Sequence, residues 1–189
     1  LSIPLRVVTR PPPRSLSLSV IEGARAARFE CVAVLDADLS HDPEDLVGLV
    51  HAVARGECDV AVASRYADGG AILDWPLWRR LLSAAGTRLA RSLSRARDPL
   101  SGFFACRRAL LTGEIDLHPR GYKILLELLA RGQGLRVKEL PTRFEDRRRG
   151  SSKLRLRQEL EFLAQVLSLI SLHLKTLIPF HSQPRRVVS

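Results

Sequence analysis

A short, valine-rich apolar run that ends abruptly in acidic residues constrains this sequence most. Cys31–Leu35 is unbroken apolar sequence, and Asp36-Ala37-Asp38 follows it directly. Such a run is typical of a strand buried in a parallel sheet. At Asp42-Pro43-Glu44-Asp45, a capping residue, a proline and acidic side chains predict the start of a helix. We therefore expect an α/β fold in which strands and helices alternate.

The rest of the sequence continues this alternation. Further strands are predicted at Ile3–Thr9, Asp59–Ala63, Ser101–Cys106 and Leu135–Leu140. Helices are predicted at Leu16–Phe29, Glu44–Arg55, Pro76–Arg97, Tyr122–Arg131 and Leu154–Leu174. The strand, helix and strand over 31–63 predict a βαβ unit with a right-handed crossover. In the helix at 76–97, the apolar face is predicted to consist of Leu82, Ala85, Leu89 and Leu93.

Composition limits the kind of protein and its partners. The chain has 189 residues, of which 46% are hydrophobic, as expected for one globular domain with a proper core. Its net charge of +10 favours polyanions, which include nucleic acid, anionic lipid headgroups and phosphorylated small molecules. Charge alone does not select among these partners.

The cysteines and the amino terminus bear on the cellular environment. Cys31, Cys58 and Cys106 are far apart in apolar runs, a pattern that predicts reduced core thiols and a cytosolic protein. The first residues lack the charged-then-apolar order of a signal peptide. Because the sequence contains no methionine, we expect it to be a fragment of a longer protein.

The acidic pair that follows the apolar run is a candidate metal site. Asp36 and Asp38 stand at the carboxyl end of the predicted strand, where open α/β sheets place their ligands. Two carboxylates one residue apart can bind one hard divalent cation, Mg²⁺ or Mn²⁺, that also holds a diphosphate. The alternative is that both residues only cap a loop.

Five stretches, in order, resemble glycosyltransferases of family 2, and in particular the branch of polyprenyl-phosphate mannose synthases. They are Val32–Glu44, Ala63–Gly70, Asp98–Phe104, Gly121–Leu128 and Glu139–Lys153. The resemblance implies a GT-A type nucleotide-binding sheet with flanking helices. The family's first βαβ stretch has no counterpart before Leu1, so we expect an N-terminally truncated catalytic domain over 1–154. An amphipathic helix and tail, a candidate for the membrane interface, are expected to follow over 155–189.

The same resemblance assigns site residues. It implies that Asp36 and Asp38 ligate the metal, with Ser40 at a position where the family often has a glutamine ligand. That difference leaves the coordination by Ser40 open. The resemblance further implies that Asp38, Asp98 and Arg65 are catalytic, with Asp98 positioning the acceptor or the transferring sugar.

Cationic and polar side chains are assigned to the substrates. The resemblance implies that Arg65, Arg79 and Ser83 bind the acceptor phosphate, and guanidinium groups and a hydroxyl suit a phosphate monoester. The alternative for Arg79 is a solvated helix face. The resemblance also places Glu127 in the reaction cleft. Arg147 and Lys153 belong to a basic loop that could close over the donor diphosphate or form a juxtamembrane patch.

These assignments predict metal-dependent, inverting transfer of mannose from GDP-mannose to dolichyl or polyprenyl phosphate at the cytoplasmic membrane face. One alternative is a UDP-sugar donor. Another is a non-catalytic basic module with metal-independent, salt-sensitive binding. No nucleic-acid partner is predicted. The uncharged run Phe162–Leu174 is shorter than the ~20 residues of a spanning helix, and it suits either an interfacial helix on an anionic membrane or a core helix.

Overall fold

The computed structural model describes residues 5–9, 11, 15–38, 40–72, 77–118, 122–144 and 156–177, with the side chains of 78–82, 156–161, 163 and 174–177 left aside. The helices are α1 Leu16–Ala26, α2 Asp45–Ala54, α3 Leu77–Arg91, α4 Arg108–Thr112, α5 Ile124–Arg131 and α6 Leu156–Leu177. The strands are β1 Cys31–Val34, β2 Val60–Ser64, β3 Ala71–Ile72, β4 Phe104–Arg107, β5 Val137–Pro141 and β6 Arg143–Phe144.

The central sheet is mixed, with the strand order β1-β4-β2-β5. β4 runs antiparallel to both β1 and β2, whereas β2 and β5 are parallel. The expected β1–α2–β2 unit is present, but β4 lies between its two strands. β3 and β6, which the sequence pattern did not predict, form a small parallel pair.

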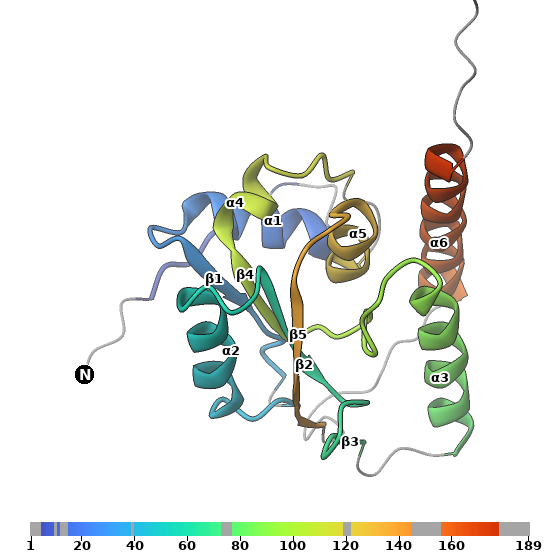
Figure 1. The fold of residues 1–189 in the computed structure, drawn as a ribbon, viewed down its shortest axis with the longest axis horizontal. Coiled ribbons are helices and arrows are strands. Elements are labelled where there is room, and N and C mark those ends of the chain that lie inside the picture. Colours follow the sequence, from blue (N-terminus) through green and yellow to red (C-terminus); the bar gives the residue numbers. More distant parts are fainter. Residues whose placement is uncertain are drawn as a thin grey trace, which may run out of the picture.

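Helices cover both faces of the central sheet (Figure 1). Side chains alternate between the faces of a strand. In β2, Val60 and Val62 therefore pack in one cluster with residues of α1, α4 and α5, while Ala61 and Ala63 pack in another with residues of α2. This double coverage accounts for the unbroken apolar character of β2, all five of whose residues are buried.

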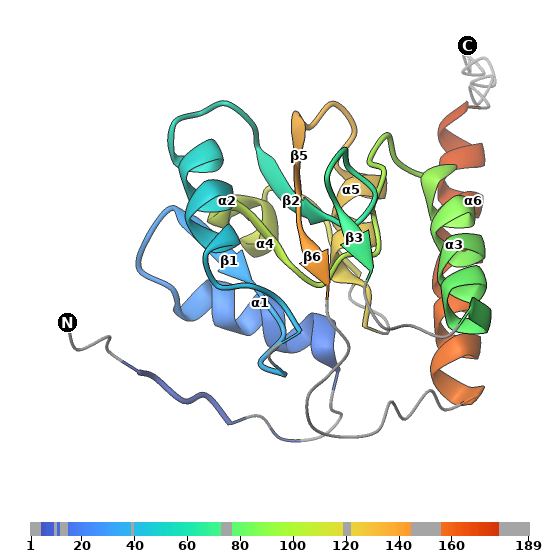
Figure 2. The same ribbon diagram turned by 90° about the horizontal axis from the view of Figure 1, so that it is seen from below.

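A third apolar cluster joins α5 to the helices α3 and α6, which adjoin each other at one side of the molecule (Figures 1 and 2). Leu126 of α5 and Phe162 of α6 belong to this cluster, together with Ala90 of α3. A methyl group built on Gly86 would lie 3.6 Å from the Phe162 ring, so small residues let α3 approach α6 closely. α5 therefore links the sheet to the α3–α6 pair.

Several predictions from the sequence need correction. No strand forms at 5–9, the described part of the predicted strand Ile3–Thr9. α3 ends at Arg91 instead of Arg97, because a series of turns follows it. The predicted apolar face of α3 is also wrong in part: Leu89 is 39% exposed, whereas Ala90 is fully buried against α6. Leu93, which was also predicted, is buried in the same cluster, so Ala90 and Leu93 make this contact.

The thiols agree with the sequence analysis. Cys58 and Cys106 are buried, Cys31 is half-buried, and all three are free. Burial raises the pKa of Cys106 to about 12, so that thiol stays protonated at neutral pH. The prediction of reduced core thiols is confirmed.

Truncating Leu128 tests the packing of α5 on the sheet. Leu128 is fully buried in the cluster shared with α1 and β2. We expect Leu128→Ala to lower the free energy of unfolding by about 2–5 kcal/mol, because it removes buried methyl groups and leaves a cavity. Leu167→Ala on α6, where the side chain is 65% exposed, is the control and should change it little. Equal effects in urea titrations would contradict this packing.

Candidate active site

The loop after β1 holds the predicted carboxylates. Asp38 Oδ1 accepts hydrogen bonds from the backbone N–H of Ser40 at 3.1 Å and from its hydroxyl at 2.5 Å. Ser40 is only 2% exposed, so the residue that binds Asp38 is itself buried in the protein. The loop then enters α2, where the Asp42 side chain accepts from the Glu44 N–H and satisfies a donor at the helix start. The acidic loop is therefore held by its own hydrogen bonds.

A buried ion pair follows the end of β2. Arg65 donates from Nε and Nη2 to the two oxygens of Asp98, each at 2.8 Å, and its backbone N–H donates to Asp98 Oδ2 at 3.0 Å. The Asp98 side chain is fully buried and that of Arg65 is 11% exposed. Burial acts to lower the pKa of Arg65, but the hydrogen bonds and the charge of Asp98 outweigh it and raise the pKa. Asp98 therefore holds Arg65 charged and in one orientation.

Glu139 of β5 fixes the position of Asp98. Its two carboxylate oxygens accept from the backbone N–H groups of Arg97 and Asp98, both at 2.8 Å. Ser101 fastens the other end of the same turn, since its hydroxyl contacts Ala63 O at 2.8 Å and accepts from the Phe103 N–H at 3.1 Å. The turn Asp98–Phe103 is thus anchored to both β2 and β5.

The same turn lies directly against the acidic loop. A methyl group built on Gly102 would stand 2.8 Å from Asp36 Oδ2, a distance that real side chains essentially never show. Any larger residue here would make the Asp36 carboxylate turn away from this position. The turn therefore brings together Asp36 at one end and the Arg65–Asp98 pair at the other, although these residues are far apart in sequence.

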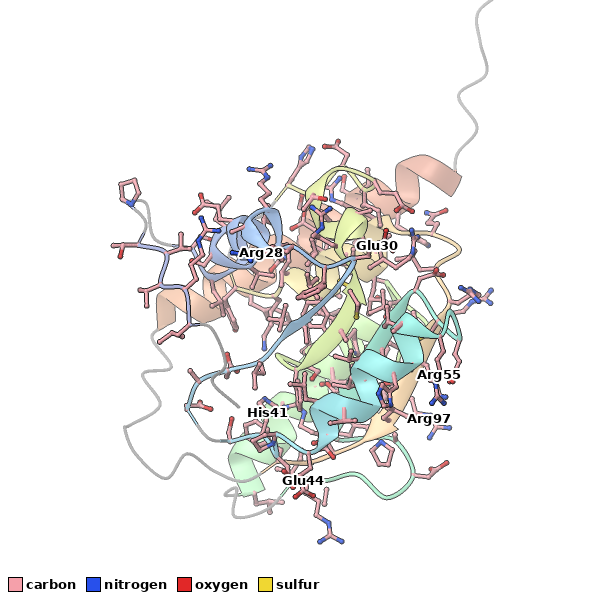
Figure 3. All side chains as sticks on the ribbon, turned by 90° about the vertical axis from the view of Figure 1, so that its left-hand side faces the viewer. Arg28, Glu30, His41, Glu44, Arg55 and Arg97 are labelled. Atoms are coloured by element: carbon pink, nitrogen blue, oxygen red, sulfur yellow. The ribbon has the colours of Figure 1, made fainter. Side chains whose placement is uncertain are left out.

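His41 packs between the turn and β6. Its ring centroid lies 5.0 Å from that of Phe103 and 5.1 Å from that of Phe144. Figure 3 shows His41 and Glu44 at the end of α2 that receives the acidic loop. Burial lowers the pKa of His41, against the opposing charges of Asp36 and Asp38, so the imidazole is neutral at pH 7. Because the Arg65 guanidinium lies 5.7 Å from the Phe144 ring, β6 also borders the ion pair.

Glu127 lies in a different environment from the Arg65–Asp98 pair. It is 2% exposed, and its carboxylate accepts from the His118 N–H and from Arg131 Nε at 3.0 Å. Gln165 of α6 donates to the other oxygen at 3.5 Å. These residues line a cavity of about 80 Å³ between α5 and α6. The contacts seen here tie two helices together, and a role in the reaction cleft stays a prediction.

The other predicted substrate-binding residues are only partly described. Ser83 lies on α3 with its hydroxyl 3.3 Å from that of Tyr66. Arg79 is in α3, but its side chain lies outside the described set. Arg147 and Lys153 fall outside the described residues altogether.

Sequence reasoning assigned no role to Glu139, Gly102, Tyr66 or Arg91. Glu139 and Gly102 belong to stretches that carry the family resemblance, and this was the available signal. Their partners are Asp98 and Asp36, at positions 41 and 66 residues away in sequence. Such pairings depend on the order of strands in the sheet, which no local pattern encodes.

Comparison with known proteins places this arrangement in a family. The family described as "Glycosyl transferase family 2" matches residues 1–113. A dolichol-phosphate mannosyltransferase of Pyrococcus furiosus is 37% identical over 88% of this chain and 48% of its own length. A dolichol-phosphate mannosyltransferase of Saccharomyces cerevisiae is 34% identical over 87% of this chain and 64% of its own length. The chain thus spans about half to two thirds of these relatives.

Solved structures support the fold. The chain is similar to glucosyl-3-phosphoglycerate synthase from Mycobacterium tuberculosis, in a complex with Mn²⁺, UDP-glucose and phosphoglyceric acid. The TM-score is 0.58 at 19% identity, over 87% of this chain and 57% of the synthase. The α/β fold of GT-A type predicted from the sequence is thereby confirmed.

Removing the charge of Asp98 tests the buried ion pair. We expect Asp98→Asn to lower the free energy of unfolding by about 3–5 kcal/mol, because it leaves the Arg65 guanidinium buried without a counter-charge. Asp68→Asn is a matched control, since Asp68 also pairs with an arginine, Arg97, but is 97% exposed. Thermal and urea unfolding measure both. A stability loss no larger than that of the control would show that the pair contributes little.

Proposed function

The chain belongs to glycosyl transferase family 2, and we propose that it carries the acidic loop and the acceptor side of an enzyme that transfers mannose from GDP-mannose to dolichyl or another polyprenyl phosphate. The observation that carries the proposal is the turn Asp98–Phe103. It contacts Asp36, a candidate ligand of a diphosphate-bound metal, at one end, and at the other it fixes a guanidinium that suits a phosphate acceptor. The similarity to dolichol-phosphate mannosyltransferases supports this choice of sugar and acceptor.

The proposed reaction is a single displacement. An oxygen of the acceptor phosphate attacks the anomeric carbon of mannose, and the bond between that carbon and the diphosphate oxygen breaks. GDP leaves with the electron pair, and attack from the opposite face inverts the configuration. Because the acceptor phosphate is already an anion, it needs no general base. The structure offers no base at Asp98 either, because both of its carboxylate oxygens already accept hydrogen bonds from Arg65.

The acidic loop fits a hard divalent cation. Asp36, Asp38 and Ser40 offer only oxygen donors, which Mg²⁺ and Mn²⁺ prefer. Within the described ranges, no three His, Cys, Asp or Glu side chains are grouped to hold an ion. That is expected of a site in which one or two carboxylates act together with water and substrate phosphates. A metal bound there would offset the negative charge that develops on the leaving diphosphate.

Arg65 is the proposed acceptor-side cation. Its orientation is set before substrate binds, because Asp98 holds it through two side-chain hydrogen bonds and Glu139 holds Asp98. A cation that is already oriented loses little conformational entropy on binding a phosphate. Asp98 is then a positioning residue in this proposal. Arg79, Arg147 and Lys153 remain proposed phosphate-binding cations on the strength of the sequence resemblance.

The proposal includes a peripheral position on the cytoplasmic face of an anionic membrane. Within the part of the chain that the structure describes, no helix combines the length and apolar character that crossing a bilayer requires. α3 and α6 carry exposed leucines, with Leu77 71% and Leu167 65% exposed. The net charge of +10 adds attraction to an anionic surface. Exposed leucines on a basic protein suit the headgroup region that a lipid-linked acceptor occupies.

Asp38→Asn tests the transfer reaction and the metal site together. Asparagine keeps an Oδ1 acceptor for Ser40, so the loop can retain its hydrogen bonds while it loses a charge. We expect the full-length gene product to transfer mannose from GDP-mannose to a polyprenyl phosphate with Mn²⁺. The variant should lose at least about 100-fold in kcat and bind Mn²⁺ more weakly in calorimetry.

Asp42→Asn is the matched control, because it removes a charge from the same loop and preserves the cap on Glu44. Its activity and Mn²⁺ affinity should stay close to those of the wild type. If product forms with UDP-sugars and not with GDP-mannose, the donor is a UDP-sugar and the proposed donor is wrong. A folded protein that yields no product with either class of donor would overturn the proposal and favour a basic binding module.

A further inference from the structure

Tyr66 lies close to two guanidinium groups. The Arg65 Cζ atom is 5.6 Å from the centroid of the Tyr66 ring, and the Arg91 Cζ atom is 5.4 Å from it. Both distances lie within the range of cation–π attraction, which is electrostatic and follows from the negative face of the ring. The Tyr66 ring therefore attracts both guanidinium groups and favours their positions close to one residue.

The position of Tyr66 is fixed at both ends. Its backbone N–H donates to Ser64 Oγ at 3.3 Å, and its hydroxyl lies 3.3 Å from Ser83 Oγ, where either oxygen can donate. Ser83 is one of the residues predicted to bind the acceptor phosphate. Tyr66 thus joins the end of β2, where Arg65 stands, to the start of the polar stripe on α3.

Ser83, Thr87 and Arg91 form that stripe, since residues four apart lie above one another on a helix. Thr87 is 2% exposed, and its hydroxyl has no hydrogen-bond partner among the described residues. Ser83 is half-buried and Arg91 is exposed, so the two ends of the stripe, rather than the buried Thr87, can meet a polar ligand.

Among the described residues, a backbone oxygen and no carboxylate holds Arg91 in place. Its Nε donates to the backbone oxygen of Arg97 at 2.7 Å, and no described residue accepts from its two terminal nitrogens. This differs from Arg65, whose charge is balanced by Asp98. Arg91 thus brings to the ring that Arg65 also contacts a positive charge that no described carboxylate balances.

We propose that Arg91 is a further binding residue for the acceptor phosphate and that Tyr66 is its positioning residue. This inference rests on the proposed function, and it adds a cation beyond Arg65, Arg79 and Ser83. The terminal nitrogens of Arg91 donate to phosphate oxygens, while the Tyr66 ring and the Arg97 carbonyl fix the guanidinium plane. Ser83 shares the phosphate and is oriented by the Tyr66 hydroxyl.

The test compares Arg91→Gln with Arg88→Gln in the full-length gene product. Both arginines are exposed on α3, but no contact between Arg88 and Tyr66 is present among the described residues. We expect Arg91→Gln to raise the KM for a short polyprenyl phosphate about 10- to 100-fold, because a charge-assisted contact is lost. The donor KM and the melting temperature should not change. Arg91→Lys should recover part of the loss, and Arg88→Gln should resemble the wild type.

Two further variants separate the ring of Tyr66 from its hydroxyl. Tyr66→Leu removes the surface on which Arg91 rests, so its acceptor KM should approach that of Arg91→Gln. Tyr66→Phe keeps the ring, so we expect a rise of only several-fold. Arg91→Gln would overturn the inference if it matched Arg88→Gln, or if it changed the donor KM or the melting temperature to the same extent as the acceptor KM.

Binding without turnover separates this inference from the proposed function. Calorimetry with farnesyl phosphate, and with inorganic phosphate in a parallel titration, needs no donor. Farnesyl phosphate binding that weakens in Arg91→Gln would support the phosphate site even if no transfer occurred. If the protein transfers mannose but Arg91→Gln binds farnesyl phosphate as tightly as the wild type, the proposed function holds and the proposed role of Arg91 is rejected. Absence of farnesyl phosphate binding to the wild type would overturn the inference.

Discussion

The buried pair of Arg65 and Asp98 is the interaction on which the rest of the site depends. A guanidinium is costly to bury unless a carboxylate faces it with good geometry. Asp98 meets this requirement with both oxygens and also accepts from the Arg65 backbone. The end of β2 and the turn after α3 are therefore fixed relative to one another, and the positions of other polar groups follow from that constraint.

The turn Asp98–Phe103 transmits this constraint to both sides of the site. Glu139 holds its first residue from β5, and Gly102 admits the carboxylate of Asp36. On the acceptor side, Tyr66 follows Arg65 directly and contacts Arg91. The proposed donor and acceptor groups thus share one rigid support, which is the arrangement that transfer between two phosphorylated substrates requires.

The sequence was sufficient for the parts of the fold that local patterns determine. Apolar runs located β1, β2 and β5, and the proline and acidic residues located the start of α2 within one or two residues. It did not predict that β4 lies between β1 and β2, because strand order depends on contacts between distant segments. The face of α3 was misjudged in part for a related reason, since Ala90 packs against α6 whereas the expected Leu89 is exposed.

The candidate site shows the same division. Family resemblance assigned Asp36, Asp38, Arg65 and Asp98 to the site, and in the structure they adjoin strand ends or turns. It did not show that the Asp98 carboxylate is bound by Arg65, or that Glu139 holds the backbone of Asp98.

A double-mutant cycle between Arg65→Met and Glu139→Gln, measured by urea unfolding, tests most directly whether Glu139 supports the Arg65–Asp98 pair. We expect a coupling of at least about 1 kcal/mol, although the two side chains share only Asp98 as a partner. Losses that add within about 0.3–0.5 kcal/mol would contradict the account.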